Sequence, residues 1–285
     1  MSFEFHKYQG TGNDFIIIYD SLSRFPFDNH DIVKRLCDRH FGIGADGLML
    51  VRKHKEHGYE MKYANSDGKE STMCGNGGRC FAAFLIAKDV KHKSGDVKFL
   101  AIDGLHEAHV KQSGWVSLKM NDVKSLEIID ETEYVLNTGS PHVVKIVSNV
   151  DEIDLIPAAH AIRYNDRFKE KGININFMTE ELHRSKAAMI DHTLIFTPYN
   201  AQIDVRTYER GVENETLSCG TGSVAAALIK IMLSQRHGNK ERSGVLVNTK
   251  GGPLIVTAKM PSAGTFTEIH LEGFTELVFK GEIKI

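Results

Sequence analysis

The alternation of apolar and polar positions predicts short strands along most of the chain. Five runs are rich in β-branched and other apolar residues and are bounded by Gly, Asn or Asp, a pattern typical of strands. These runs cover residues 15–19, 48–51, 116–120, 143–147 and 254–257. Such a distribution predicts a sheet-rich protein.

Three other segments have the apolar spacing of helices, at residues 31–40, 79–88 and 223–234. The first places Ile32, Val33 and Leu36 on one face. The other two are apolar on nearly every side, which is typical of helices enclosed by surrounding structure. We therefore expect each of these two to be the central helix of a curved, mainly antiparallel sheet.

A short motif recurs at the start of the two apolar helices. It reads Met-Cys-Gly-Asn-Gly at 73–77 and Ser-Cys-Gly-Thr-Gly at 218–222, so Cys74 and Cys219 stand 145 residues apart (219 minus 74). Five more positions match at this offset, because Tyr63, Glu70, Ser71, Ala82 and Ile86 recur as Tyr208, Glu215, Thr216, Ala227 and Ile231. The repeat predicts two copies of one unit, each presenting one thiol where a loop becomes a helix.

From the repeat we predict an α/β (α+β) fold with two pseudo-symmetric halves and an active site in the cleft between them. We expect residues 1–122 to form the N-terminal half, with Cys74, and residues 123–273 to form the C-terminal half, with Cys219. The polar, acidic segment 121–133 is the expected crossing between the halves. Residues 274–285 are expected to form a terminal strand that returns to the first half.

Composition and charge exclude several classes of function. The 285 residues carry a net charge of −2, with a sequence pI near 6.7, so we expect no binding to nucleic acid or to an anionic membrane surface. No apolar run reaches transmembrane length, and the first residues lack the order of a signal peptide. Four cysteines in a chain of this length argue against a disulfide scaffold. We therefore predict a cytoplasmic protein.

The two repeated cysteines are the candidates for chemistry. A helix N-terminus carries unsatisfied N–H groups and a partial positive charge, which stabilise a thiolate, and the glycines after each cysteine let a ligand approach the backbone. Cys37 and Cys80 are expected to be buried and inert. A metal site is disfavoured because Cys74 and Cys80 have a C-x5-C spacing and Cys219 has no nearby Cys or His. Thiol redox chemistry remains an alternative, although a C-x-x-C motif is absent.

Two equivalent thiols suit a reaction that removes a proton from a carbon next to a carboxylate and returns one from the opposite face. One sulfur must start as thiolate and the other as thiol, which a cysteine pKa near 8.5 allows with modest tuning. No cofactor is then required. The segment 42–47 fits G-x-G-x-x-G, but a predicted helix precedes it and a predicted strand follows, the reverse of a dinucleotide site.

An ordered set of segments resembles the diaminopimelate epimerase family along the whole chain. These segments are residues 10–15, 42–47, 65–68, 73–80, 141–142, 209–212 and 219–222. The resemblance implies a cofactor-independent interconversion of LL- and meso-2,6-diaminopimelate, which feeds lysine and peptidoglycan precursor synthesis. It also implies two pseudo-symmetric halves and a homodimer.

The resemblance further implies roles for individual residues. Cys74 and Cys219 correspond to the acid and the base. Donors to the α-carboxylate would be Gly75, Asn76, Gly220 and Thr221. His142 and Glu209 correspond to polar partners of the α-amino group, and the distal clamp would be Asn13, Asn65, Asn174 and Arg210.

Two positions depart from the family pattern. Ser140 stands before Pro141 and His142, where the family usually has asparagine. Serine is shorter and offers a single hydroxyl, so a contact from this position to the substrate is expected to be lost or to pass through water. Gly47 occupies a place where some members have glutamine. Arg79, at the start of a predicted helix, is expected only to tie loops together.

Three alternatives stay open on the sequence. Proline racemases and hydroxyproline epimerases share the fold, but they usually carry histidine after the first Cys-Gly, where this chain has Asn76. A thiol redox protein would use the same acidic cysteines. A noncatalytic relative would bind an amino acid or a partner without turning it over.

Overall fold

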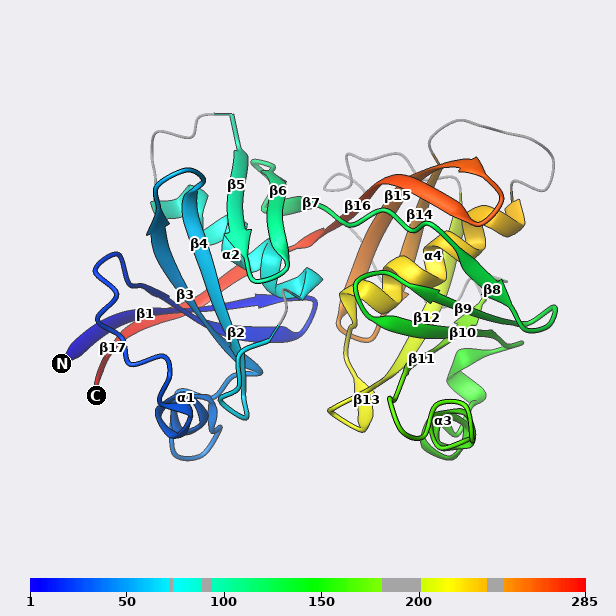
Figure 1. Ribbon diagram of the computed structural model, residues 1–285, viewed down its shortest axis with the longest axis horizontal. Helices are drawn as coiled ribbons and strands as arrows, with labels where there is room; N and C mark the ends of the chain where they lie inside the picture. The colour runs from blue at the N-terminus through cyan, green and yellow to red at the C-terminus, as the bar shows by residue number, and fades with distance from the viewer. Residues whose placement is uncertain (72–73, 89–93, 181–200, 235–242) are drawn as a thin grey trace. The chain divides into compact units, whose positions relative to one another are not determined.

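The protein has a mixed α/β architecture made mostly of strands, with four α-helices among the described residues (Figure 1). The computed structural model describes residues 1–71, 74–88, 94–180, 201–234 and 243–285. Met73 of the first repeated motif lies outside these residues. All five strands and all three helices predicted from the sequence are present, and the predicted fold class is confirmed.

The chain divides into two compact units. The first comprises Met1–Leu118 and Gly273–Ile285, and the second comprises Lys119–Glu272. The segment 121–133, which we expected to cross between the halves, contributes strands to the second unit instead. Val123 forms a bridge with Phe266, and β8 (Leu126–Ile128) pairs with β9 (Glu133–Asn137). Its polar composition reflects exposed side chains on paired backbone.

Among its described residues, the first unit has eight strands and two helices. The strands are β1 (Ser2–Gly10), β2 (Asn13–Tyr19), β3 (Gly47–His54), β4 (Gly58–Asn65), β5 (Asp96–Ala101), β6 (Gly104–Val110), β7 (Trp115–Lys119) and β17 (Glu276–Lys284). The helices are α1 (His30–Cys37), between β2 and β3, and α2 (Gly75–Lys88), between β4 and β5. Along the sheet, β2–β3 is parallel, β3–β4 antiparallel, β4–β5 parallel and β5–β6 antiparallel.

The second unit repeats this order. Besides β8 and β9, its strands are β10 (Pro141–Ile146), β11 (Asn174–Thr179), β12 (Ala201–Glu209), β13 (Asn214–Thr216), β14 (Ser243–Thr249), β15 (Gly252–Ser262) and β16 (Thr265–Phe274). After a single 3-10 turn (Val150–Glu152), α3 (Leu155–Arg163) lies between β10 and β11, and α4 (Gly220–Ser234) follows β13. The pair β10–β11 is parallel, β11–β12 antiparallel, β12–β14 parallel and β14–β15 antiparallel. The same sequence of pairings and helices in both units is the structural form of the 145-residue repeat.

Strands enclose the two apolar helices, as predicted. Helix α2 packs against β1, β2, β5 and β6, and α4 packs against strands from β9 to β15. Both begin immediately after Cys74 and Cys219, as the motif predicted, so they extend the apolar ranges 79–88 and 223–234 toward the N-terminus. Glycine-rich sequence disfavours a helix by propensity, but here burial of the first turn overrides that preference.

Helix α1 ends at Cys37, three residues before the predicted end. Asp38 leaves the helix in an extended conformation, and its carboxylate accepts hydrogen bonds from the backbone N–H groups of His40 and Phe41. This helix packs on the apolar side of β2 and β3 through Val33 and Leu36. Because α1 precedes the segment 42–47 and β3 follows it, the order is the reverse of a dinucleotide site.

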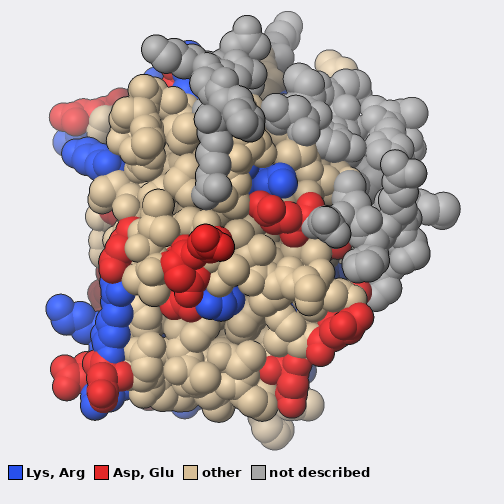
Figure 2. Space-filling model, turned by 90° about the vertical axis from the view of Figure 1, so that its right-hand side faces the viewer, with Lys and Arg blue, Asp and Glu red and all other residues tan. Residues whose placement is uncertain are grey.

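The surface shows no dominant charge. On the face drawn in Figure 2, acidic and basic side chains are interspersed among uncharged residues. No helix in the described part of the chain is both long and apolar enough to span a bilayer.

Candidate active site

Each repeated cysteine occupies the position just before a helix. The carbonyl of Cys74 accepts a hydrogen bond from the Gly78 N–H at 2.8 Å, and its Sγ accepts one from the Gly77 N–H at 3.3 Å. In the second unit, the Cys219 carbonyl accepts from the Ser223 N–H at 2.8 Å. Both sulfurs therefore lie at helix N-termini, where the helix dipole favours negative charge.

The structure brings Asn13 together with Cys74. The carboxylate of Asp46 accepts a hydrogen bond from Asn13 Nδ2 at 2.5 Å, which turns the amide oxygen of Asn13 toward the Cys74 Sγ at 3.6 Å. Arg39 bridges Asp46 and Asp14 with hydrogen bonds of 2.8 to 2.9 Å. Burial alone would raise the pKa of Asp14, but hydrogen bonds from Arg39 and Lys7 outweigh it and lower the pKa to about 2. This charged cluster fixes the orientation of Asn13.

Asn65 lies at the exposed end of β4. Its side-chain oxygen accepts a hydrogen bond from the Tyr63 hydroxyl at 2.7 Å, and its backbone N–H donates to the Lys69 carbonyl. The turn that follows β4 thus holds the Asn65 side chain near the strand end.

A buried polar layer lies beneath the first turn of α2. Asn76 is almost fully buried, and its side-chain oxygen accepts a hydrogen bond from the Thr11 hydroxyl at 3.3 Å. Arg79 is fully buried and donates to Thr11 Oγ1 at 3.1 Å and to the Gly75 carbonyl at 3.4 Å. Burial lowers the pKa of Arg79 to about 10, and no described carboxylate forms an ion pair with it. Arg79 thus connects the loop before β2 with the first turn of α2, in agreement with the expectation that it ties loops together.

In the second unit, the predicted residues around Cys219 form one connected set. The Ser140 hydroxyl lies 2.9 Å from His142 Nε2, 3.2 Å from Asn174 Nδ2 and 3.2 Å from Thr221 Oγ1. Thr221 Oγ1 in turn lies 3.5 Å from the Cys219 Sγ. Ser140 immediately precedes β10 and Asn174 begins β11, and the parallel pairing of these strands, with His142 opposite Asn174, brings the two side chains together.

His142 is fully buried and neutral. Burial, together with the positive charge of Arg210, lowers its pKa from 6.5 to about 3. Its Nδ1 lies 3.1 Å from Asn176 Nδ2, so both ring nitrogens have partners inside the unit. We did not predict Asn176 from the sequence. The sequence signal for Asn176 is an amide between two apolar residues, Ile175 and Phe177, in β11.

Glu209 and Arg210 end β12, beside this set. The Arg210 backbone N–H donates to the Asn174 side-chain oxygen at 2.9 Å, and its guanidinium donates to the Lys171 carbonyl at 3.1 Å. The Arg210 residue is exposed, whereas Glu209 is half-buried. Gly220 is buried in the first turn of α4.

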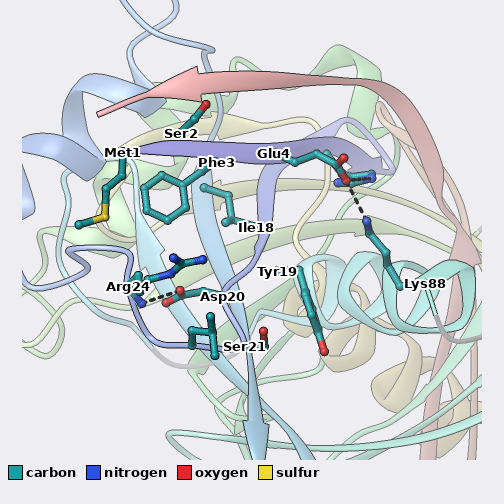
Figure 3. Close-up of a pocket in the computed structure, with 12 residues that line it drawn as sticks. Met1, Ser2, Phe3, Glu4, Ile18, Tyr19, Asp20, Ser21, Arg24 and Lys88 are labelled. Carbon is teal, nitrogen blue, oxygen red and sulfur yellow. Dashed lines mark hydrogen bonds and ion pairs between the residues drawn. The ribbon is translucent and has the colours of Figure 1, made fainter.

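A separate pocket of the first unit contains none of the predicted site residues (Figure 3). Residues of β1 and β2 and the loop after β2 line it, and Lys88 closes one side through a 2.8 Å bond to Glu4. Hydrogen bonds within its wall engage both carboxylates, since Asp20 accepts from the backbone N–H of Arg24 and Glu4 accepts from Lys88. Neither of the repeated cysteines lines this pocket.

Comparisons with known proteins agree on one family. A sequence model described as diaminopimelate epimerase matches residues 5–126 and 134–267. The chain is 42% identical over 278 residues to a diaminopimelate epimerase of Flavobacterium psychrophilum, and the match covers 98% of this chain and 99% of that relative.

Solved structures with low sequence identity share the fold. A PhzF-family phenazine biosynthesis protein of Bacillus anthracis matches with a TM-score of 0.70 at 13% identity, over 100% of both chains. A hydroxyproline epimerase from Agrobacterium vitis matches with a TM-score of 0.65 at 13% identity, over 99% of this chain and 92% of that one. At this low identity the solved structures support only the fold class. The family assignment rests on the sequence matches, which cover nearly all of the chain. The chain therefore belongs to the diaminopimelate epimerase family and is an isomerase of the epimerase type.

Proposed function

We propose that the protein interconverts LL- and meso-2,6-diaminopimelate by two-base proton transfer, with Cys74 and Cys219 as the two groups. Family membership supports the reaction. The observation that supports the choice of groups is that each unit places one cysteine sulfur at the N-terminus of its buried helix. The product feeds lysine and peptidoglycan precursor synthesis.

The proposed mechanism needs only groups of the chain. One cysteine, as thiolate, removes the α-proton and becomes a thiol, while the other, as thiol, delivers its proton to the opposite face and becomes a thiolate. The α-carboxylate accepts hydrogen bonds from first-turn N–H groups at Gly75, Asn76, Gly220 and Thr221. These donors also stabilise the negative charge that develops when the α-proton leaves.

The remaining predicted residues have supporting roles in this proposal. Asn13, Asn65, Asn174 and Arg210 would bind the distal amino-acid group, with the exposed guanidinium of Arg210 suited to a carboxylate. Glu209 would accept from the α-amino group. Because both ring nitrogens of His142 are engaged with Ser140 and Asn176, we assign His142 an indirect role rather than a contact to the amino group.

We also propose, from the family resemblance, that the protein acts in the cytoplasm as a homodimer. Sedimentation equilibrium of the purified chain measures the second point directly.

The test of the function uses LL-diaminopimelate and the purified chain in deuterium oxide, without added cofactor. We expect meso product on chiral chromatography and one solvent deuterium at its α-carbon by mass spectrometry. Cys74→Ala and Cys219→Ala should each lower turnover by at least about 100-fold, since each removes one of the two proton-transfer groups. Cys37→Ala, in α1, is the matched control for loss of a thiol and should keep wild-type turnover.

Other outcomes separate the alternatives. Wild-type turnover in both cysteine variants would exclude the two-base assignment. Deuterium incorporation into proline or hydroxyproline, but not into diaminopimelate, would favour the racemase relatives. Reductant-linked turnover without isotope exchange would favour thiol redox chemistry.

A further inference from the structure

Ser140, the plainest departure from the family pattern, lies at the centre of the hydrogen-bonded set around Cys219. Hydroxyl hydrogens are not visible from heavy-atom positions, but groups that can only donate or only accept fix their direction. Two series of hydrogen bonds whose directions are fixed in this way end at the Ser140 hydroxyl.

The first series begins at Asn176. Its Nδ2 lies 2.9 Å from the Val143 carbonyl, which can only accept, so the amide NH2 group must face that side. The same Nδ2 lies 3.1 Å from His142 Nδ1. His142 Nδ1 therefore accepts, and in a neutral imidazole the hydrogen is then on Nε2. His142 Nε2 accordingly donates to the Ser140 hydroxyl at 2.9 Å.

The second series passes through Asn174. Its side-chain oxygen accepts from the Arg210 backbone N–H, and its Nδ2 donates to the Pro141 carbonyl at 3.1 Å. Both contacts fix the amide orientation, so Nδ2 also donates to the Ser140 hydroxyl at 3.2 Å. The oxygen of Ser140 thus accepts two hydrogen bonds. Its own hydrogen is directed to Thr221 Oγ1, the third polar atom in contact with it.

Thr221 completes the path, because its oxygen accepts from Ser140 and its hydrogen is then available to the Cys219 Sγ at 3.5 Å. We propose that Ser140 is a positioning residue, which turns the Thr221 hydroxyl hydrogen toward the Cys219 sulfur and thereby favours the thiolate of Cys219. A hydrogen bond donated to the charged form of an acid stabilises that form. This inference rests on the proposed function, because the protonation state of Cys219 matters for turnover only if Cys219 transfers protons.

We call this path, from Asn176 and His142 through Ser140 and Thr221 to Cys219, the relay. Most of its side chains are held in place by burial. Asn176 and His142 are fully buried, and Asn174 is 5% exposed. Thr207 donates to the Asn176 side-chain oxygen at 3.0 Å, which anchors the far end of the relay. The charge nearest to the relay in the described contacts is that of Arg210, whose backbone N–H donates to Asn174, and both Arg210 and the neighbouring Glu209 stay unchanged in the variants below.

The test measures the thiolate of Cys219 directly, without substrate. The protein is alkylated briefly with iodoacetamide between pH 5.5 and 9.5, digested, and the modification of each cysteine is quantified by mass spectrometry. The peptide 211–230 reports on Cys219 and a peptide that starts at residue 70 reports on Cys74. We expect Ser140→Ala to raise the midpoint of Cys219 alkylation by about half a unit to one unit, and the midpoint of Cys74 to stay unchanged.

A matched pair of variants at Thr221 and a control at Thr138 make the test more specific. Thr221→Val should shift Cys219 as Ser140→Ala does, whereas Thr221→Ser, which keeps the hydroxyl, should restore the wild-type midpoint. Thr138→Val removes a 2.9 Å bond to the Thr221 carbonyl without touching the relay, so it should leave the Cys219 midpoint in place.

A wild-type midpoint for Cys219 in both Ser140→Ala and Thr221→Val would overturn the proposal. An equal shift in Thr138→Val would also overturn it, because the effect would then follow from general loosening around Thr221. If the midpoint shifts as expected while no diaminopimelate is epimerised, the relay stands and the proposed function fails.

Discussion

At the scale of single residues, burial keeps the imidazole of His142 neutral, and its hydrogen bonds to Asn176 and Ser140 fix the tautomer. Its folded pKa, lowered to about 3, lies below the unfolded value near 6.5. Between these values the unfolded chain binds a proton that the folded chain does not. His142 therefore contributes stability that is fully present above pH 6.5 and is lost as the pH falls.

We expect the free energy of unfolding to decrease by about 2 kcal/mol from His142 alone between pH 7 and pH 5, at about 1.4 kcal/mol per unit below pH 6.5. Urea denaturation at several pH values measures this slope, and most carboxylates stay ionised in the range. His142→Gln should show the smaller slope, whereas His40→Gln, at an exposed position, should keep that of the wild type. Equal slopes for His142→Gln and the wild type would contradict the assignment of a neutral, buried imidazole.

At the scale of elements, the two central helices share a geometry but differ in what packs on their first turns. Gly77 and Gly222 occupy equivalent positions of the repeat. A Cβ on Gly222 would lie 2.2 Å from the side-chain oxygen of Asn176, and three hydrogen bonds hold this amide group in place: one to its oxygen and two from its Nδ2. A Cβ on Gly77 would lie 2.6 Å from the terminal methyl of Met49, a flexible side chain. The same substitution therefore meets a rigid neighbour in one unit and an adaptable one in the other.

We expect Gly222→Ala to destabilise the protein by about 2 kcal/mol, because overpacking exceeds the gain in helix propensity of about 1 kcal/mol. Gly77→Ala should change stability by less than about 1 kcal/mol, since Met49 can move aside. Urea denaturation of the two single variants provides the comparison. The interpretation fails if both variants have the same stability.

At the scale of the whole molecule, the first unit is closed by the end of the chain. Strand β17 pairs antiparallel with β1, from Ser2 with Lys284 to Gln9 with Glu276, so residues 267 to 282 positions apart form one ladder. Most β17 side chains are exposed, and its main contribution is backbone hydrogen bonding to β1, together with the contact of Gly281 with Phe5. Strand β1 has β2 as its other partner.

A variant that ends at Thr275 should therefore weaken the first unit selectively. We expect the backbone amides of β1 to exchange with solvent at least about tenfold faster, because β1 becomes an edge strand. Hydrogen exchange followed by mass spectrometry reports on each segment, and β11 and β12 of the second unit are the internal control. Equal acceleration in β11 and β12 would show instead that the terminal strand stabilises both units together.

Much of this architecture could be predicted from the sequence because its causes are local or repeated. The run at 15–19 forms a strand through its own β-branched residues, and the 145-residue offset predicted the duplicated order of strands and helices. The start of α2 directly after Cys74 followed from the motif, whereas the apolar pattern alone reached back only to residue 79, because propensity disfavours the glycines that burial of the first turn accommodates. The end of α1 was missed because one side chain, that of Asp38, caps the following loop.

For the candidate site, the sequence by itself determined which residues are proposed for the chemistry, because two cysteines followed by glycines in a repeated setting require only spacing to be recognised. Tertiary structure alone decided how the surrounding groups are used. Arg79 and Asn176 become buried anchors through partners that lie 31 to 68 residues away, and the hydrogen on His142 follows from the orientation of Asn176. The physical reason is that the direction of a hydrogen bond and the loss of solvation depend on neighbours that the fold assembles, which spacing along the chain does not encode.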